Sequence, residues 1–255
     1  MRSQTGFWII ALLVLAGCGP RKPASVVVDP DLAVLVSSDA VALSGVDLQA
    51  LRKSPVWTKW FAPRIEQLGK ENGADLAGQG IQILAFTDGK SAQMFAKTRS
   101  GVERLDSKQP LPPRRAGIPP ALLDRMRTIP PQNAIWAVGV SPHGLLGNLL
   151  PESGNLANLR NIAEGIEDYT LGMDLAQGLK LRANAGYSSE EAAARVHDGL
   201  RGLVALAKLS TPKNRPELLR IYERIQITRE RAALRVAADL SPEELNSVLG
   251  LAGAR

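Results

Sequence analysis

The sequence predicts an α+β protein with antiparallel sheets and helices on one face. Residues 179–186 and 234–239 each alternate between core-forming side chains and mainly polar ones, which is typical of antiparallel strands with one wet face. The segments 81–87 and 90–98 flank Asp88-Gly89, a pair suited to a hairpin turn that needs positive φ. Helical segments follow the strands, and the hairpins favour antiparallel over parallel pairing.

Residues 1–17 predict a secretion signal. A basic start at Arg2 leads into an apolar run, 7–15, and two small residues then precede Cys18, the only cysteine of the chain. The apolar run is far shorter than the about 20 residues that a membrane-spanning helix needs. We therefore expect cleavage between Gly17 and Cys18 and no permanent transmembrane anchor.

The order Leu15-Ala16-Gly17-Cys18 resembles the lipobox of bacterial lipoproteins. The resemblance implies that a diacylglycerol is attached to Cys18 through a thioether, that cleavage occurs before it, and that the new amino terminus is acylated. Gly19 is not the aspartate of an inner-membrane retention signal, so in a Gram-negative envelope we expect the outer membrane, facing the periplasm. The alternative is an ordinary thiol that follows a secretory signal.

Residues 18–25 are expected to form a lipidated tether. Its prolines, Pro20 and Pro23, keep it extended, so at about 3.1 Å per residue it reaches roughly 20 Å from the lipid. Arg21 and Lys22 are candidate membrane contacts, each contributing about 1 kcal/mol at an anionic leaflet.

The first α+β module is predicted to span 26–99. Residues 39–47 predict a strand that ends at Asp47, whose carboxylate can cap the helix that follows. Trp57, Trp60 and Phe61 are spaced to cluster on one helix and form a candidate interaction patch; burial against the sheet is the alternative.

Residues 100–131 predict a proline-rich, basic connection. It contains Arg114-Arg115 and a short predicted helix from Ala121 to Arg127. We expect its prolines to keep the flanking modules from merging into one sheet, and a stiff surface loop is favoured over a polyproline ligand.

The second α+β module is predicted to span 132–255. Residues 133–141 can be laid over 39–47 without a gap, and a second hairpin flanks 176–178. We therefore predict two pseudo-repeated strand-helix-hairpin modules, with chance similarity as the alternative. Capping boxes at 188–191 and 241–244 predict two further helices.

Several runs are similar to uncharacterised bacterial envelope proteins built from duplicated α+β modules. They are Asp47-Leu48-Gln49-Ala50-Leu51-Arg52-Lys53-Ser54-Pro55-Val56-Trp57, Ile129-Pro130-Pro131-Gln132-Asn133-Ala134-Ile135-Trp136 and Leu200-Arg201-Gly202-Leu203-Val204-Ala205-Leu206-Ala207-Lys208. The resemblance covers most of the mature chain and implies no activity.

Templates for catalysis and metal binding fail. Ser210-Thr211-Pro212-Lys213 matches S-x-x-K, but Pro212 disfavours the helix that would align serine and lysine. His143 and His197, the only histidines, lack partners at zinc-ligand spacing. We expect no enzyme activity, no cofactor and no metal site.

Composition narrows the partner class. The chain has a net charge of +6 but only 4% aromatic residues, which gives little support to nucleic-acid binding. We expect a lipid-anchored, non-catalytic envelope protein that binds a protein or glycan. The alternative is an envelope-polymer hydrolase with a dispersed active site.

Lipid on Cys18 is directly testable. In a bacterium that processes lipoproteins, the wild-type protein should take up a labelled fatty acid and fractionate with membranes, whereas Cys18→Ala should do neither. A wild-type protein without label would contradict the lipobox assignment.

Overall fold

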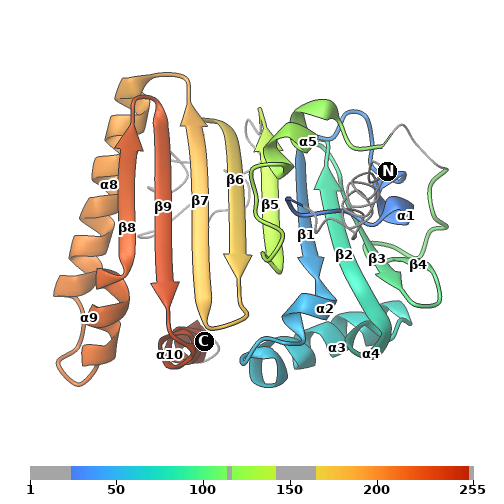
Figure 1. Ribbon diagram of the computed structural model, residues 1–255, viewed down its shortest axis with the longest axis horizontal. Helices are drawn as coiled ribbons and strands as arrows, with labels where there is room; N and C mark the ends of the chain where they lie inside the picture. Colours follow the sequence, from blue (N-terminus) through green and yellow to red (C-terminus); the bar gives the residue numbers. More distant parts are fainter. Residues whose placement is uncertain (1–23, 114–116, 142–164, 253–255) are drawn as a thin grey trace, which may run out of the picture.

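In the computed structural model, which describes residues 24–113, 117–141 and 165–252, the described residues form one nine-stranded antiparallel sheet (Figure 1). The strand order is β4-β3-β2-β1-β5-β6-β7-β9-β8. The strands are β1 (Ala42–Asp47), β2 (Gly80–Thr87), β3 (Ala92–Thr98), β4 (Val102–Arg104), β5 (Ile135–Val140), β6 (Ile166–Asp174), β7 (Leu179–Tyr187), β8 (Ile225–Glu230) and β9 (Ala233–Leu240). The α+β class is confirmed.

Helices connect and cover these strands. They are α1 (Pro30–Ala33), α2 (Leu48–Leu51), the π-helix η2 (Trp57–Phe61), α3 (Ala62–Asn72), α4 (Leu76–Gln79), α5 (Pro120–Met126), α8 (Glu190–Leu209), α9 (Pro216–Glu223) and α10 (Pro242–Ala252). The short helix expected in the connection is α5, while β4 and β8 were not anticipated from the sequence.

The expectation that the two modules form separate sheets is wrong. Strands β1 and β5 pair in the middle of the sheet, from Ala42 opposite Gly139 to Val46 opposite Ile135. The prolines of the connection do not prevent this, because none of them lies in either strand, where a missing N–H would interrupt the ladder.

One face of the sheet, here called the apolar face, carries a continuous row of apolar side chains. Partners in a ladder point to the same side, so the register places eight residues in line across eight strands. They are Ala96, Ile83, Val46, Ile135, Met173, Leu181, Ala238 and Ile225. Helices α2 to α4 pack on one part of this face, and α8 packs on β7, β8 and β9.

The opposite face changes character between β5 and β6. A row across seven strands starts apolar and ends polar: Phe86, Leu43, Val138, Thr170, Asn184, Arg235 and Thr228. Its apolar part is buried under α1, α5 and the chain from Val26, whose side chains share one core with it. The expected arrangement of helices on one face therefore holds for β7 to β9 and fails for β1 to β5.

Local signals explain most element boundaries. The Asp47 carboxylate accepts from the Ala50 N–H at 2.9 Å and caps α2 as expected. Ser241 and Glu244 form the expected capping box of α10, with bonds of 2.9 and 3.2 Å between each backbone N–H and the other side chain. At α8 the cap is Ser189, which bonds the Ala192 N–H, rather than Ser188.

The first hairpin turn is longer than expected. Strand β2 ends at Thr87 and β3 begins at Ala92, so the turn comprises Asp88 to Ser91, with Gly89 at a φ of 87°. The second hairpin joins β6 to β7 as expected, and Gly178 there has a φ of 105°.

A tryptophan ring packs against a glycine of the neighbouring strand in the central pair, β1 and β5. Trp136 is 1% exposed, and its indole lies over Gly45 on the neighbouring strand, where a Cβ would overlap the ring. The absence of a side chain at Gly45 therefore gives Trp136 its place in the core that α1 and α5 complete.

Substitution of Gly45 tests this packing. Gly45→Ala should reduce the free energy of unfolding by about 1–3 kcal/mol, because overpacking a rigid core forces side chains and backbone to shift. Urea denaturation measures the change. Gly199→Ala is the matched control: Gly199 lies in α8 with open space around its Cα, so alanine should stabilise the protein by up to about 1 kcal/mol. Equal effects of the two substitutions would contradict this account.

Candidate functional site

The half of the sheet formed by β7, β9 and β8 presents a surface of exposed polar side chains, here called the polar face. Its residues lie opposite the apolar face and come from three neighbouring strands. They are Lys180, Arg182 and Asn184 from β7, Arg235 and Asp239 from β9, and Gln226, Thr228 and Glu230 from β8. No apolar cluster of the described residues covers this surface.

An ion pair across β7 and β9 organises the polar face. Arg182 donates to both carboxylate oxygens of Asp239, at 2.6 and 3.0 Å. The hydrogen bond from Arg182 lowers the pKa of Asp239, and the same bond raises the pKa of Arg182. Both side chains are more than half exposed, so the pair fixes geometry more than it stabilises the fold.

The polar face ends at β6, where polar side chains are more buried and pair with one another. The Asn184 amide donates to the Thr170 hydroxyl at 3.1 Å, and Thr170 is buried. Arg125 of α5 donates to Asp168 at 2.9 Å. These contacts form the boundary between the covered half of this side of the sheet and its open half.

A hollow of about 370 Å³ lies on the sheet beside the β2–β3 hairpin. Its lining includes the small residues Ala42, Ser44 and Ala85 of β1 and β2, together with Tyr169 and Lys90. Burial raises the pKa of Tyr169. Its ring packs against Gly139, where a Cβ would overlap it, so packing accounts for the half-buried position of Tyr169.

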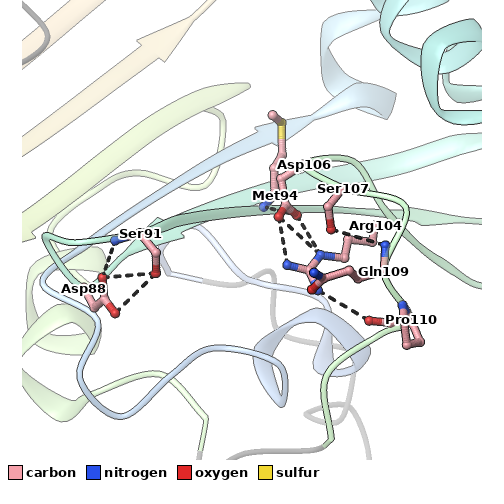
Figure 2. A network of polar contacts seen from close by, with 8 residues as sticks. All are labelled: Asp88, Ser91, Met94, Arg104, Asp106, Ser107, Gln109 and Pro110. Carbon is pink, nitrogen blue, oxygen red and sulfur yellow. Dashed lines mark hydrogen bonds and ion pairs between the residues drawn. The ribbon is translucent and has the colours of Figure 1, made fainter.

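Figure 2 shows a polar network at the same hairpin and at the β4 edge of the sheet. Asp88 accepts from the Ser91 N–H at 2.7 Å and closes the turn. Asp106 accepts from Arg104 Nη2 at 2.9 Å and from the Met94 N–H at 3.1 Å. The Asp106 carboxylate thus accepts from a backbone N–H on the outer edge of β3, at a point beyond the end of β4, where no described strand pairs with that edge. We interpret these contacts as stabilising the edge of the sheet.

The expected aromatic patch is largely engaged in packing. Trp57, Trp60 and Phe61 are half-buried and pack on the core beneath α2 to α4. The Trp60 indole N–H donates to Asn246 of α10 at 2.7 Å, which joins η2 to the last helix of the described chain. The packing agrees with the burial alternative.

The other residues singled out from the sequence are not brought together. Ser210 follows the end of α8 and Lys213 is exposed in the loop before α9, so they do not share a helix turn. His197 lies on α8 with Nδ1 2.8 Å from Asp198. Cys18, Gly17, Arg21, Lys22 and His143, and the helix expected between the strand and the hairpin of the second module, lie outside the described residues.

Within residues 24–113, 117–141 and 165–252, no group of three or more His, Cys, Asp or Glu side chains is placed to hold a metal ion. None of the helices in these ranges is long and apolar enough to cross a bilayer. Comparison with models of known protein families, with curated proteins and with solved structures gave no match.

The polar face was not singled out from the sequence as a site. The signal was present in the alternation of Lys180, Arg182 and Asn184 with apolar residues, which predicted only a wet strand face. The pairing of Arg182 with Asp239 joins residues far apart in the chain, and the register of β7 with β9 brings them together.

The Arg104–Asp106 contact predicts a pH dependence. Burial raises the pKa of the Asp106 carboxyl. Hydrogen bonds from Arg104 and the Met94 N–H together lower this pKa by more than burial raises it, so it lies below the usual 3.8. A lowered carboxylate pKa stabilises the fold above the unfolded-state pKa, and this contribution is lost as pH falls through the folded-state value. At pH 7, Asp106→Asn should therefore be less stable than wild type by on the order of 1 kcal/mol, and the difference should vanish below the folded-state pKa.

Urea denaturation between pH 3 and pH 7 measures this difference. Asp124→Asn is the control, because Asp124 and its partner Arg127 are 67% and 72% exposed and their pairing should contribute little. A stability difference for Asp106→Asn that does not depend on pH would refute the assignment.

Proposed function

We propose that this protein is a non-catalytic, lipid-anchored envelope protein that binds a protein or glycan partner through the polar face. The observation that carries the proposal is an open three-stranded surface of polar side chains on a sheet whose opposite side is packed by α8. The lipobox resemblance supports attachment through Cys18, with Arg21 and Lys22 near the lipid headgroups. We propose an outer-membrane location facing the periplasm on the same ground.

The chemistry of the polar face suits a polar macromolecule. It offers guanidinium, amide, hydroxyl and carboxylate groups and so carries both positive and negative charge. Two of its strands, β7 and β9, are hydrogen-bonded to a neighbouring strand on each side, which holds their backbone in place. A rigid surface loses little conformational entropy when a partner docks. Mixed charge favours a partner with a defined pattern of donors and acceptors over a uniformly charged polymer.

A duplicated origin of the two halves belongs to the same proposal. Each half starts at a central strand, β1 or β5, continues through a long connection, and then adds a hairpin outward in the sheet. The similar order, with the gap-free overlay of 39–47 on 133–141, supports two related modules. The second half differs in having α8, α9 and β8 beyond its hairpin.

The second candidate is a hydrolase acting on an envelope polymer. The hollow beside the β2–β3 hairpin favours it, because Lys90, Tyr169 and the hydroxyls of Ser44 and Ser91 are among its lining. Against it, the Ser91 hydroxyl lies 3.3 Å from both oxygens of Asp88 within the turn, which a local turn contact explains.

Site-specific photo-crosslinking in intact cells tests the proposed face. A photoreactive residue at Lys180 or Gln226, both exposed on the polar face, should capture the same partner, whereas one at Glu66 on α3 should not. Arg235→Glu should reduce the yield roughly tenfold, as expected for about 1.4 kcal/mol at a contact residue, without lowering the melting temperature.

Two results would count against this proposal. Equal capture at Glu66 and at the polar face would remove the face as the binding surface. Release of soluble fragments from purified envelope polymer, abolished by a substitution at Lys90 or Tyr169, would favour the hydrolase.

A further inference from the structure

The outer edge of β8 faces a groove of about 500 Å³ formed with α8 and α9, here called the β8 groove. Its helical wall consists of Arg201, Val204, Ala205 and Lys208, which recur at the spacing of one helix face. Tyr222 and Glu223 of α9 complete the lining at the end where β8 begins. Figure 1 shows α8 running alongside β8 at this border of the sheet.

The strand contributes its backbone edge to the groove. Four consecutive residues, Ile225 to Thr228, line it. Because successive side chains of a strand point to opposite faces, a groove on one face would be lined by every second residue. β8 is the last strand in the sheet order and, among the described strands, pairs only with β9, so its outer N–H and C=O groups are directed toward the groove.

The helical wall carries unpaired positive charge. Arg201 and Lys208 form no ion pair with any residue in the described ranges, and the lining includes one carboxylate, that of Glu223. Seven residues of helix separate the two cations by about 10 Å along the axis, a span covered by about three residues of extended chain. Between them, Val204 and Ala205 offer an apolar contact.

We propose that the β8 groove binds an extended acidic peptide segment of a partner protein, which adds to the sheet as a strand beside β8. Addition of a strand to a free edge supplies affinity through main-chain hydrogen bonds and specificity through flanking side chains. Here Arg201 and Lys208 select carboxylates, and Val204 and Ala205 accept an apolar side chain between them. The inference rests on the proposed binding function and names the chemistry of the partner.

The charge of β8 itself argues against a second copy as the occupant. Arg224 and Arg229, at the start and near the end of this strand, are balanced by Glu223 and Glu230, so β8 of another copy would bring no net charge complementary to Arg201 and Lys208. An acidic peptide brings the complementary charge.

Fluorescence anisotropy on the full-length protein in a non-ionic detergent tests the proposal. The probe is a labelled eight-residue peptide of alternating Glu and Val, and we expect saturable binding. Two kinds of control peptide separate charge from strand pairing. A peptide of alternating Lys and Val removes the charge complementarity. N-methylation of every second amide of the Glu-Val peptide blocks strand pairing, and two such peptides are tested, one with the odd-numbered and one with the even-numbered amides methylated. The Lys-Val peptide and one of the two N-methylated peptides should each bind at least tenfold more weakly.

Matched charge reversals locate the site. The double variant Arg201→Glu/Lys208→Glu should weaken binding of the Glu-Val peptide at least tenfold. The double variant Lys213→Glu/Arg220→Glu makes the same change of charge at exposed positions outside the lining and should alter binding less than twofold. Circular dichroism of both variants shows whether each is folded.

Several outcomes would overturn the proposal: no saturable binding, equal binding of the Lys-Val peptide, equal binding of both N-methylated peptides, or equal effects of the two double variants. A dimer that the Glu-Val peptide dissociates would assign the groove to a second copy. If crosslinking at Lys180 fails while the Glu-Val peptide still binds, the polar face is refuted as a binding surface and the groove proposal stands. If crosslinking succeeds while the peptide does not bind, the groove proposal is refuted and the polar face stands.

Discussion

The antiparallel pairing of β1 with β5 is the constraint on which the rest of the structure depends. It joins the two halves of the chain into one sheet and fixes the register of the rows that cross it. The close approach of Trp136 to Gly45 occurs within this pair, so the same contact that joins the halves also fills the core under α1 and α5. A shift of one residue in this register would turn every side chain of one half to the wrong face.

From this register follows the division of the sheet into a covered and an open half. On one side, apolar residues continue from β8 to β3, and helices α2 to α4 and α8 pack on its two ends. On the other side, the row that includes Leu43 and Val138 becomes polar at Thr170. Apolar side chains are stabilised by burial, whereas polar ones can remain in contact with water. The described chain therefore buries only the apolar half of the side that carries Leu43 and Val138. The open half is the surface that we propose for binding.

The two edges of the sheet are treated differently. At the β4 edge, the Asp106 carboxylate bonds the Met94 N–H and is itself held by Arg104, so a side chain occupies a group that another strand could have bonded (Figure 2). At the β8 edge, a basic helix wall lies beside the strand and leaves a groove. Edge strands are usually protected against pairing with other chains. Among the described residues no side chain blocks the β8 edge in this way, which agrees with a strand edge that is used for binding.

The sequence by itself determined the α+β class, both hairpins and several helix boundaries, because turn glycines, capping side chains such as Asp47 and Ser241, and two-residue alternation act over short distances. It did not predict the single sheet, since the pairing of β1 with β5 joins segments separated by about ninety residues and leaves no local pattern. It also did not predict β8 as a strand, because only its pairing with β9 gives Ile225 and Ile227 a face to bury. The bidentate contact between Arg182 and Asp239 and the groove beside β8 likewise depend on this tertiary arrangement, which alone decides which polar residues become neighbours.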